Sequence, residues 1–216
     1  MRTRIIIVGD HAIVRSGMTE LIKRIPGLEV VGEAASGSEA LRLVARVQAD
    51  VALVDISMEV GFNGIELVKS LRSQFPALIV LVLSMHDEEL YGERALLAGA
   101  SGYISKRAPL ERIIEALERV AGGRVYASAE LLERMAALHQ SRPGVPTTRL
   151  SDRELEVLEL IGRGLGTREI AEQLRLSVKT IETYRGHLKT KLDIESAPQL
   201  VRYAVRWVDD LGAKAS

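Results

Sequence analysis

Four polar residues that suit phosphoryl chemistry stand at the ends of four short apolar runs: Asp10, Asp55, Ser84 and Lys106. Phosphoryl transfer requires an oxygen nucleophile, a divalent metal ion and positive donors for the charge on the equatorial oxygens. Two neighbouring carboxylates repel each other unless a cation lies between them, and oxygen ligands with room for water suit Mg2+. One such residue at a strand end is commonly a helix cap or a solvated charge. Four together favour a phosphate site that holds Mg2+.

These residues need a scaffold that gathers strand ends, and the first half of the chain has the pattern of one. Short apolar runs at 5–8, 29–33, 51–54, 78–83 and 103–105 alternate with helix-period segments near 12–24, 37–47, 64–74, 87–98 and 109–121. This alternation predicts an α/β fold, a (βα)5 doubly wound parallel sheet. Such sheets place their sites at the carboxyl ends of the strands, where the four residues would meet.

The pattern changes after Gly122 and Gly123. A possible helix at 128–139 precedes residues 141–148, whose prolines and small polar residues are typical of an exposed linker, and from Leu150 onward only helical periodicity remains. We therefore expect an α/β domain at 1–123, a linker with a possible helix at 124–148, and a small all-α domain at 149–211.

The helical part begins with Ser151 and Glu154, which have the spacing of a capping box. A short helix near 167–174 follows, and then a tight connection to Ser177, a good cap for a helix running to about Lys191. Its apolar positions, Val178, Ile181, Leu188 and Leu192, should face the other helices. Its remaining face carries hydroxyls and an aromatic ring among cations, namely Lys179, Thr180, Thr183, Tyr184, Arg185, Lys189 and Lys191.

Two short helices joined by a tight turn, the second basic outside, describe a helix-turn-helix that binds DNA. Net charge is zero, but residues 177–191 hold four basic residues and one acidic residue, so the positive charge is local. A merely solvated basic face is the alternative. Hydroxyls interleaved with cations favour base-edge and phosphate contacts.

Composition restricts the remaining possibilities. The absence of cysteine excludes disulfides, thiolate metal sites and cysteine nucleophiles. The four strongly apolar residues at 5–8 are too few for a signal-peptide core, and no run approaches a membrane span. We expect a cytoplasmic protein with no membrane partner.

The first half resembles the receiver domains of two-component response regulators, especially the NarL/FixJ type, over residues 1 to about 121. The matching stretches are IIIVGDH at 5–11, VDISM at 54–58, LSMH at 83–86 and GYISK at 102–106. The resemblance implies that Asp55 accepts a phosphoryl group from a sensor histidine kinase and that Mg2+ is held by Asp10, Asp55 and the Ser57 carbonyl. It further implies that Ser84 and Lys106 contact the phosphate and that Tyr103 reorients on activation.

The second half resembles the LuxR-type helix-turn-helix over about 150–208, carried by LSxRExEVL at 150–158, EIA at 169–171 and SVKTIETY at 177–184. The resemblance implies base-edge contacts from Lys179, Thr180 and Thr183, and phosphate contacts from Arg185, Lys189 and Lys191. Tyr184 stands where the family often has histidine, and Gly166 where it often has serine. A last helix near 196–208 has an apolar stripe, and the resemblance implies that it forms a homodimer on DNA.

Two departures from the family pattern bear on the receiver half. Gly9 replaces the first member of an acidic pair, which predicts weaker Mg2+ binding. Glu59 replaces a proline, and Gly64 lies nine residues beyond Asp55 where the family has eight. These changes motivate an alternative, an atypical regulator whose DNA binding and assembly are independent of phosphorylation.

Two rival classes also remain open. An architectural DNA-binding protein would use its first domain only for assembly. A phosphatase with Asp55 as nucleophile would need a second acid or base and a substrate pocket, and the short loops leave little chain for either. We therefore expect a regulator and not an enzyme.

Overall fold

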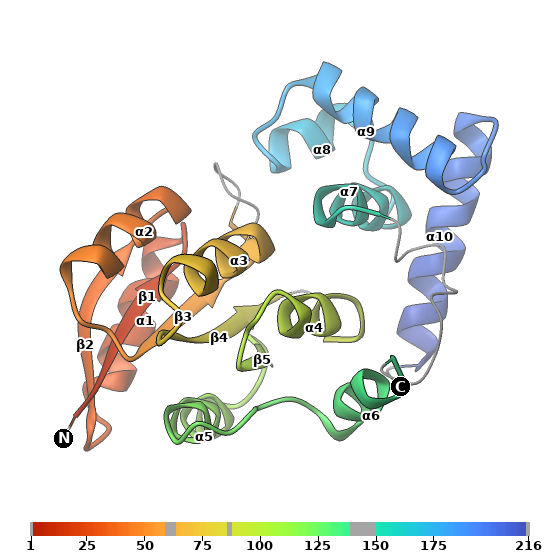
Figure 1. The fold of residues 1–216 in the computed structure, drawn as a ribbon. Helices are drawn as coiled ribbons and strands as arrows, with labels where there is room; N and C mark the ends of the chain where they lie inside the picture. The colour runs from red at the N-terminus through yellow and green to blue at the C-terminus, as the bar shows by residue number, and fades with distance from the viewer. Residues whose placement is uncertain (1, 59–63, 86–87, 139–149, 215–216) are drawn as a thin grey trace. The chain divides into compact units, whose positions relative to one another are not determined.

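The computed structural model describes residues 2–58, 64–85, 88–138 and 150–214 (Figure 1). The chain divides into two compact units, Met1–Gln140 and Ser141–Ser216, called here the first and the second unit. Most of the loop after Asp55, at 59–63, and the proline-containing linker at 141–148 lie outside the described residues, so what the sequence predicted for them has no structural counterpart.

The first unit is built on a five-stranded parallel sheet with strand order β2-β1-β3-β4-β5. The strands are β1 (Thr3–Val8), β2 (Leu28–Ala34), β3 (Val51–Asp55), β4 (Ile79–Ser84) and β5 (Gly102–Ser105). Strands β3 and β4 are almost wholly buried, as expected for apolar strands covered on both faces. The predicted (βα)5 doubly wound fold is confirmed, and each strand begins and ends within two residues of its predicted bounds.

Five helices connect or follow these strands: α1 (Ala12–Ile22), α2 (Gly37–Arg46), α3 (Gly64–Gln74), α4 (Glu88–Leu97) and α5 (Leu110–Ala121). Alternate strand residues such as Ile5, Leu53 and Leu81 share one core cluster with Ile22 of α1 and Leu117 of α5. Because successive strand side chains point to opposite faces, the other buried strand residues face the layer that contains α2 and α3.

The strand order reverses direction at β1, since β2 lies on one side of it and β3 on the other. Doubly wound sheets bind ligands beside such a switch point, at the carboxyl ends of the strands. Asp10 follows β1 and Asp55 ends β3, so the topology brings these two carboxylates to one edge.

The chain after α5 stays with the first unit. Helix α6 (Ala129–Leu138) packs against α4, as Figure 1 shows. The part of the predicted linker at 124–138 therefore lies on the α/β unit as ordered structure, and the predicted helix near 128–139 is present.

The second unit contains α7 (Asp152–Gly162), α8 (Thr167–Gln173), α9 (Val178–Lys191) and α10 (Ala197–Lys214). The predicted capping box is present, because the Ser151 hydroxyl accepts from the Glu154 amide at 3.3 Å while the Glu154 carboxylate accepts from the Ser151 amide at 2.7 Å. Ser177 caps α9 by accepting from the Thr180 amide at 3.0 Å.

Two expectations for the second unit need correction. Val178 was predicted to face the core but is 40% exposed, because it is the first residue of α9 and has no preceding helical turn beside it. Helix α10 continues to Lys214, past its predicted end near 208, since the apolar stripe used to place that end marks only the packed part of the helix.

Candidate functional site

Asp55 lies at the end of β3 with its side chain only 4% exposed. The Lys106 ammonium, just after β5, donates to its Oδ2, and the Ser57 amide donates to its Oδ1 at 2.8 Å. An ammonium and an amide that hold the two oxygens fix the carboxylate in one orientation and offset the cost of burying its charge. The sequence reasoning placed Asp55 and Lys106 together, and the structure brings them into contact.

Ser84 ends β4 beside the same carboxylate and is fully buried. Its hydroxyl lies 3.4 Å from the Ser57 hydroxyl, so two hydroxyl groups lie together next to Asp55. Three strand ends, those of β3, β4 and β5, thus supply a carboxylate, a hydroxyl and a cation at one place.

Asp10 completes the group from the end of β1. A ligand atom from each of Asp10, His11 and Asp55 can be chosen so that the three lie within 4.8 Å of one another. The His11 Nδ1 lies 2.7 Å from the Asp10 Oδ1, and the imidazole is more than half exposed. Two converging carboxylates are the oxygen donors that Mg2+ requires, so the donor set fits this ion.

The predicted DNA face lies on α9 and its flanks. Lys179 and Thr183 are exposed one turn apart, and the Thr183 hydroxyl donates to the Lys179 carbonyl at 3.0 Å. The Thr180 hydroxyl shares a hydrogen bond of 2.7 Å with Ser177. Tyr184, Arg185 and Lys189 are partly exposed. A left-handed residue, Arg175 with φ 50°, makes the tight turn between α8 and α9.

Comparison with known proteins gives a family for each unit. Residues 5–118 match the family described as "Response regulator receiver domain", and residues 148–204 match "Bacterial regulatory proteins, luxR family". The chain is 39% identical over 210 residues to the oxygen regulatory protein NreC of Staphylococcus haemolyticus, covering 94% of this chain and 97% of that protein. The chain belongs to the two-component response regulators with a LuxR-type DNA-binding domain. Response regulators of this family are DNA-binding transcription regulators and not enzymes, which excludes the phosphatase alternative.

Solved structures of response regulators also resemble this chain. RcsB from Salmonella enterica serovar Typhimurium, bound to the promoter rprA with the phosphomimetic BeF3−, is 28% identical with a TM-score of 0.63, covering 95% of this chain and 99% of that one. A LuxR-family response regulator from Aurantimonas sp. SI85-9A1 is 34% identical with a TM-score of 0.59, covering 65% of this chain and all of that one.

Gly9 of the response regulator lies directly against Asp55. A Cβ atom at this position would lie 3.2 Å from the Asp55 Cβ and 3.5 Å from its Oδ2. The Gly9 carbonyl accepts from the Arg15 guanidinium, whose Nε lies 3.6 Å from a Glu33 carboxylate oxygen. An acidic side chain at Gly9 would therefore stand beside Asp55, and its absence leaves the site with less negative charge.

The sequence reasoning did not single out His11 or Arg15. Both could have been found from their spacing, since His11 directly follows Asp10 and Arg15 lies one helical turn further on in α1.

Gly64, the glycine that lies nine residues beyond Asp55, packs closely against Ile56. A Cβ atom at Gly64 would collide with the Ile56 backbone and lie 2.6 Å from its Cβ. The first residue of α3 therefore has to be glycine.

Tyr103 lies in β5 and is 1% exposed. Its amide donates to the Tyr126 carbonyl at 2.9 Å, so the backbone of the predicted switch residue is tied to the segment that follows α5.

Lys191 has a partner that the sequence did not predict. Its ammonium donates to the Glu154 Oε2 at 2.6 Å, and the His187 Nδ1 lies 3.4 Å from the Glu154 Oε1. Burial raises the pKa of Glu154, but hydrogen bonds from Lys191 and Ser151 outweigh it and hold the pKa below its usual value of 4.5. The Lys191 charge is thus directed toward the start of α7.

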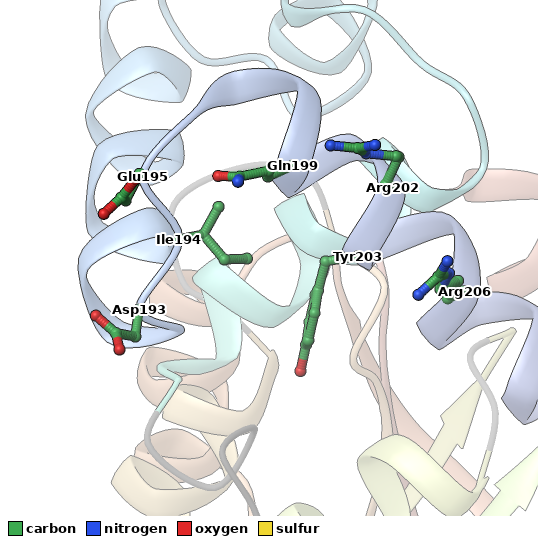
Figure 2. Close-up of a pocket in the computed structure, with 7 residues that line it drawn as sticks. All are labelled: Asp193, Ile194, Glu195, Gln199, Arg202, Tyr203 and Arg206. Carbon is green, nitrogen blue, oxygen red and sulfur yellow. The ribbon is translucent and has the colours of Figure 1, made fainter.

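The second unit also has an open hollow of about 510 Å3 at the junction of α9 and α10 (Figure 2). It is lined by Asp193, Ile194, Glu195, Gln199, Arg202, Tyr203 and Arg206. Burial raises the pKa of the Tyr203 phenol. None of the residues predicted to contact DNA lines this hollow, so the two are separate features of the unit.

No helix within the described residues is both long enough and apolar enough to cross a bilayer.

Proposed function

We propose that this response regulator accepts a phosphoryl group on Asp55 from the phosphohistidine of a sensor histidine kinase. An Asp55 carboxylate oxygen forms the new bond to phosphorus as the bond from phosphorus to the histidine nitrogen breaks. Lys106 and the Ser57 amide already orient the carboxylate, and the Ser84 hydroxyl stands beside it. The contact between Lys106 and a buried Asp55 is the observation that carries this proposal.

Asp10, Asp55 and the Ser57 carbonyl are the groups that we propose hold Mg2+. The ion supplies neutralisation of the charge on the transferring phosphoryl oxygens when bound. Lys106 and Ser84 would hold the remaining oxygens after transfer. The absence of a carboxylate at Gly9 supports the expectation that Mg2+ binds more weakly here than in a site with one more carboxylate.

The kinase would approach the carboxyl edge of the sheet. Ile13, in the first turn of α1 next to Asp10, is 88% exposed, and a large apolar side chain so exposed beside a reactive site is suited to a protein contact. This exposure supports a docking surface that begins at α1.

In the second unit we propose that Lys179, Thr180 and Thr183 contact base edges and that Arg185 and Lys189 contact phosphates, with Tyr184 at their side. Lys191 was predicted as a phosphate contact as well, but its ion pair with Glu154 makes it the weakest member of that group. Phosphate contacts give affinity to any sequence, whereas base contacts give preference.

A homodimer on DNA is the assembly that we propose. Val201 and Val205 lie one turn apart on α10, 39% and 36% exposed, while Leu200 and Ala204 of the same stripe are buried in the unit. Two copies joined along this apolar edge would present two α9 helices to paired half-sites. Because chromosomal DNA is the target, we place this activity in the cytoplasm.

The arrangement around Asp55 and the similarity of both units to response regulators favour DNA binding that is controlled by phosphorylation. They do not favour the alternative, DNA binding that is independent of phosphate. Phosphorylation can shift the equilibrium between an inactive and an active conformation of the regulator only if these two conformations differ in their affinity for the phosphoryl group. Asp55, Ser84 and Tyr103 are the proposed elements of that difference.

The test is DNA binding by fluorescence anisotropy on sites from a randomised selection, with and without acetyl phosphate and Mg2+. We expect the donor to tighten binding by the wild type and not by Asp55→Asn. Asp50→Asn is the matched control, because Asp50 precedes the same strand at its opposite end and its carboxylate accepts from the Arg4 amide. Tight binding indifferent to the donor and to Asp55→Asn would contradict the proposal.

A further inference from the structure

Residues 125–131, called here the strap, run from the end of α5 to the first turn of α6 and attach to β5. The Tyr126 amide donates to the Ser101 carbonyl at 3.0 Å, and the Tyr103 amide donates to the Tyr126 carbonyl at 2.9 Å. Tyr126 thereby forms a parallel bridge with Gly102 at the edge of the sheet. A Cβ atom at Gly102 would lie 2.7 Å from the Tyr126 carbonyl oxygen, so glycine permits this approach.

The strap has a second attachment on α4. The Ser128 amide donates to a carboxylate oxygen of Glu88 at 3.1 Å, in the first turn of α4. Leu131 is completely buried, and a Cβ atom at Gly92 would lie 2.6 Å from its Cδ2. The neighbouring Leu132 is 41% exposed, so only one of the two adjacent leucines is inserted against α4.

Both attachments lie on elements that are adjacent in sequence to residues of the acceptor site. Helix α4 follows β4, which ends at Ser84, and the Tyr103 amide belongs to β5, which leads to Lys106. Close-packed contacts leave little room for displacement. A shift of α4 or β5 that accompanies phosphorylation at Asp55 therefore has to disturb the seat of Leu131 or the bond to Tyr126.

We propose that the strap is seated on β5 and α4 in the unphosphorylated regulator and is released when Asp55 is phosphorylated, so that α6 joins the linker to the second unit. This inference rests on the proposed phosphorylation of Asp55. The released segment lengthens the connection between the two units and frees the α4–β5 surface. Coupling between two sites is reciprocal. The factor by which phosphomimetic binding favours release of the strap is therefore also the factor by which release of the strap strengthens phosphomimetic binding at Asp55.

Hydrogen exchange of the full chain, read by mass spectrometry over residues 129–136, tests the release directly. With beryllofluoride and Mg2+ the amides of this segment should exchange between about 5-fold and 150-fold faster, the usual range for coupled sites. Asp55→Asn should abolish the change. The absence of cysteine also allows a single Glu133→Cys variant to carry a fluorescent probe for the same motion.

Two variants loosen the strap from opposite sides. Leu131→Ala removes the inserted side chain, and Gly92→Ala fills its seat. Each should speed exchange of α6 without a phosphomimetic, tighten DNA binding in that state, and tighten beryllofluoride binding. Leu132→Ala is the matched control on the same helix and should change none of these. Thermal unfolding of the first unit verifies that each variant is folded.

The outcomes separate the strap from the proposed function. A phosphoryl adduct in the intact mass, together with phosphate-dependent DNA binding but unchanged exchange of α6, would overturn the strap and leave the proposed function standing. No adduct and no DNA response would overturn the proposed function and the strap with it. Faster exchange in the phosphorylated wild type that is lost in Asp55→Asn supports both.

Discussion

The contact between α7 and α10 should make Gly162 the least replaceable glycine of the second unit. A Cβ atom there would lie 2.5 Å from the Val208 Cγ2 and 2.9 Å from the Ala204 carbonyl carbon, and closer still to its oxygen. These atoms belong largely to the backbone of a packed helix, so they cannot swing away as the end of a flexible side chain can. Gly162→Ala therefore has to push α10 away from α7.

The magnitude follows from two opposing effects. Overpacking of a close-packed contact costs about 1–3 kcal/mol, and backbone overlap of this depth belongs at the upper end. Replacing glycine by alanine in a helix returns about 1 kcal/mol. We expect Gly162→Ala to lower the free energy of unfolding by about 2 kcal/mol. Gly186→Ala is the control, since a Cβ atom there meets nothing within 4 Å, and it should raise stability by about 0.5–1 kcal/mol.

The assay is urea unfolding followed by the fluorescence of Trp207, the only tryptophan, which lies on α10 and so reports the second unit alone. With a slope of about 1 kcal/mol per molar urea for a small unit, the midpoint should fall by about 2 M for Gly162→Ala and rise by less than about 1 M for Gly186→Ala. A midpoint for Gly162→Ala at or above that of the wild type would refute the close approach of the two helices.

Three further outcomes follow from the second unit. Because folding lowers the pKa of Glu154 below its usual value of 4.5, the stabilisation from its charge is complete above that value and is lost as pH falls through the folded value. Glu154→Gln should therefore lower the Trp207 unfolding midpoint at neutral pH, with the gap to wild type closing as the pH falls through the lowered pKa; a constant gap would contradict the lowered pKa. Lys189→Ala should weaken binding to all DNA sequences and reduce the salt slope by about 1, whereas Lys179→Ala should change sequence preference in a randomised-site selection. Val201→Glu should leave the unit folded but lower the protein-to-DNA stoichiometry on a paired site in sedimentation, and an unchanged dimer would exclude this face.

Much of the fold could be predicted from sequence because its signals are local. The apolar runs ending at Val8 and Val54 could only be buried parallel strands once helix-period segments separated them, and the spacing of Ser151 and Glu154 defines a cap without reference to the rest of the chain. The convergence of Asp10 and Asp55 could be predicted as well, since a doubly wound sheet has one switch point and its strand ends meet there.

Contacts between residues that are far apart in the sequence could not be predicted. Lys191 has the charge and the exposure of a phosphate-binding cation. Nothing near it in sequence indicates that its ammonium donates to Glu154, 37 residues earlier. The strap is a similar case, because residues after Gly123 look like a linker until Tyr126 is seen beside Ser101 and Leu131 beside Gly92.

The sequence by itself determined the two domain types, the order of their elements and the four polar residues at the strand ends, Asp10, Asp55, Ser84 and Lys106. Tertiary structure alone decided which face of each helix is covered: Val201 and Val205 share a stripe with Leu200 and Ala204, yet only the latter pair is buried. The physical reason is that periodicity specifies that a helix has an apolar side, whereas the width of that side which becomes buried depends on the shape of the neighbouring helices packed against it.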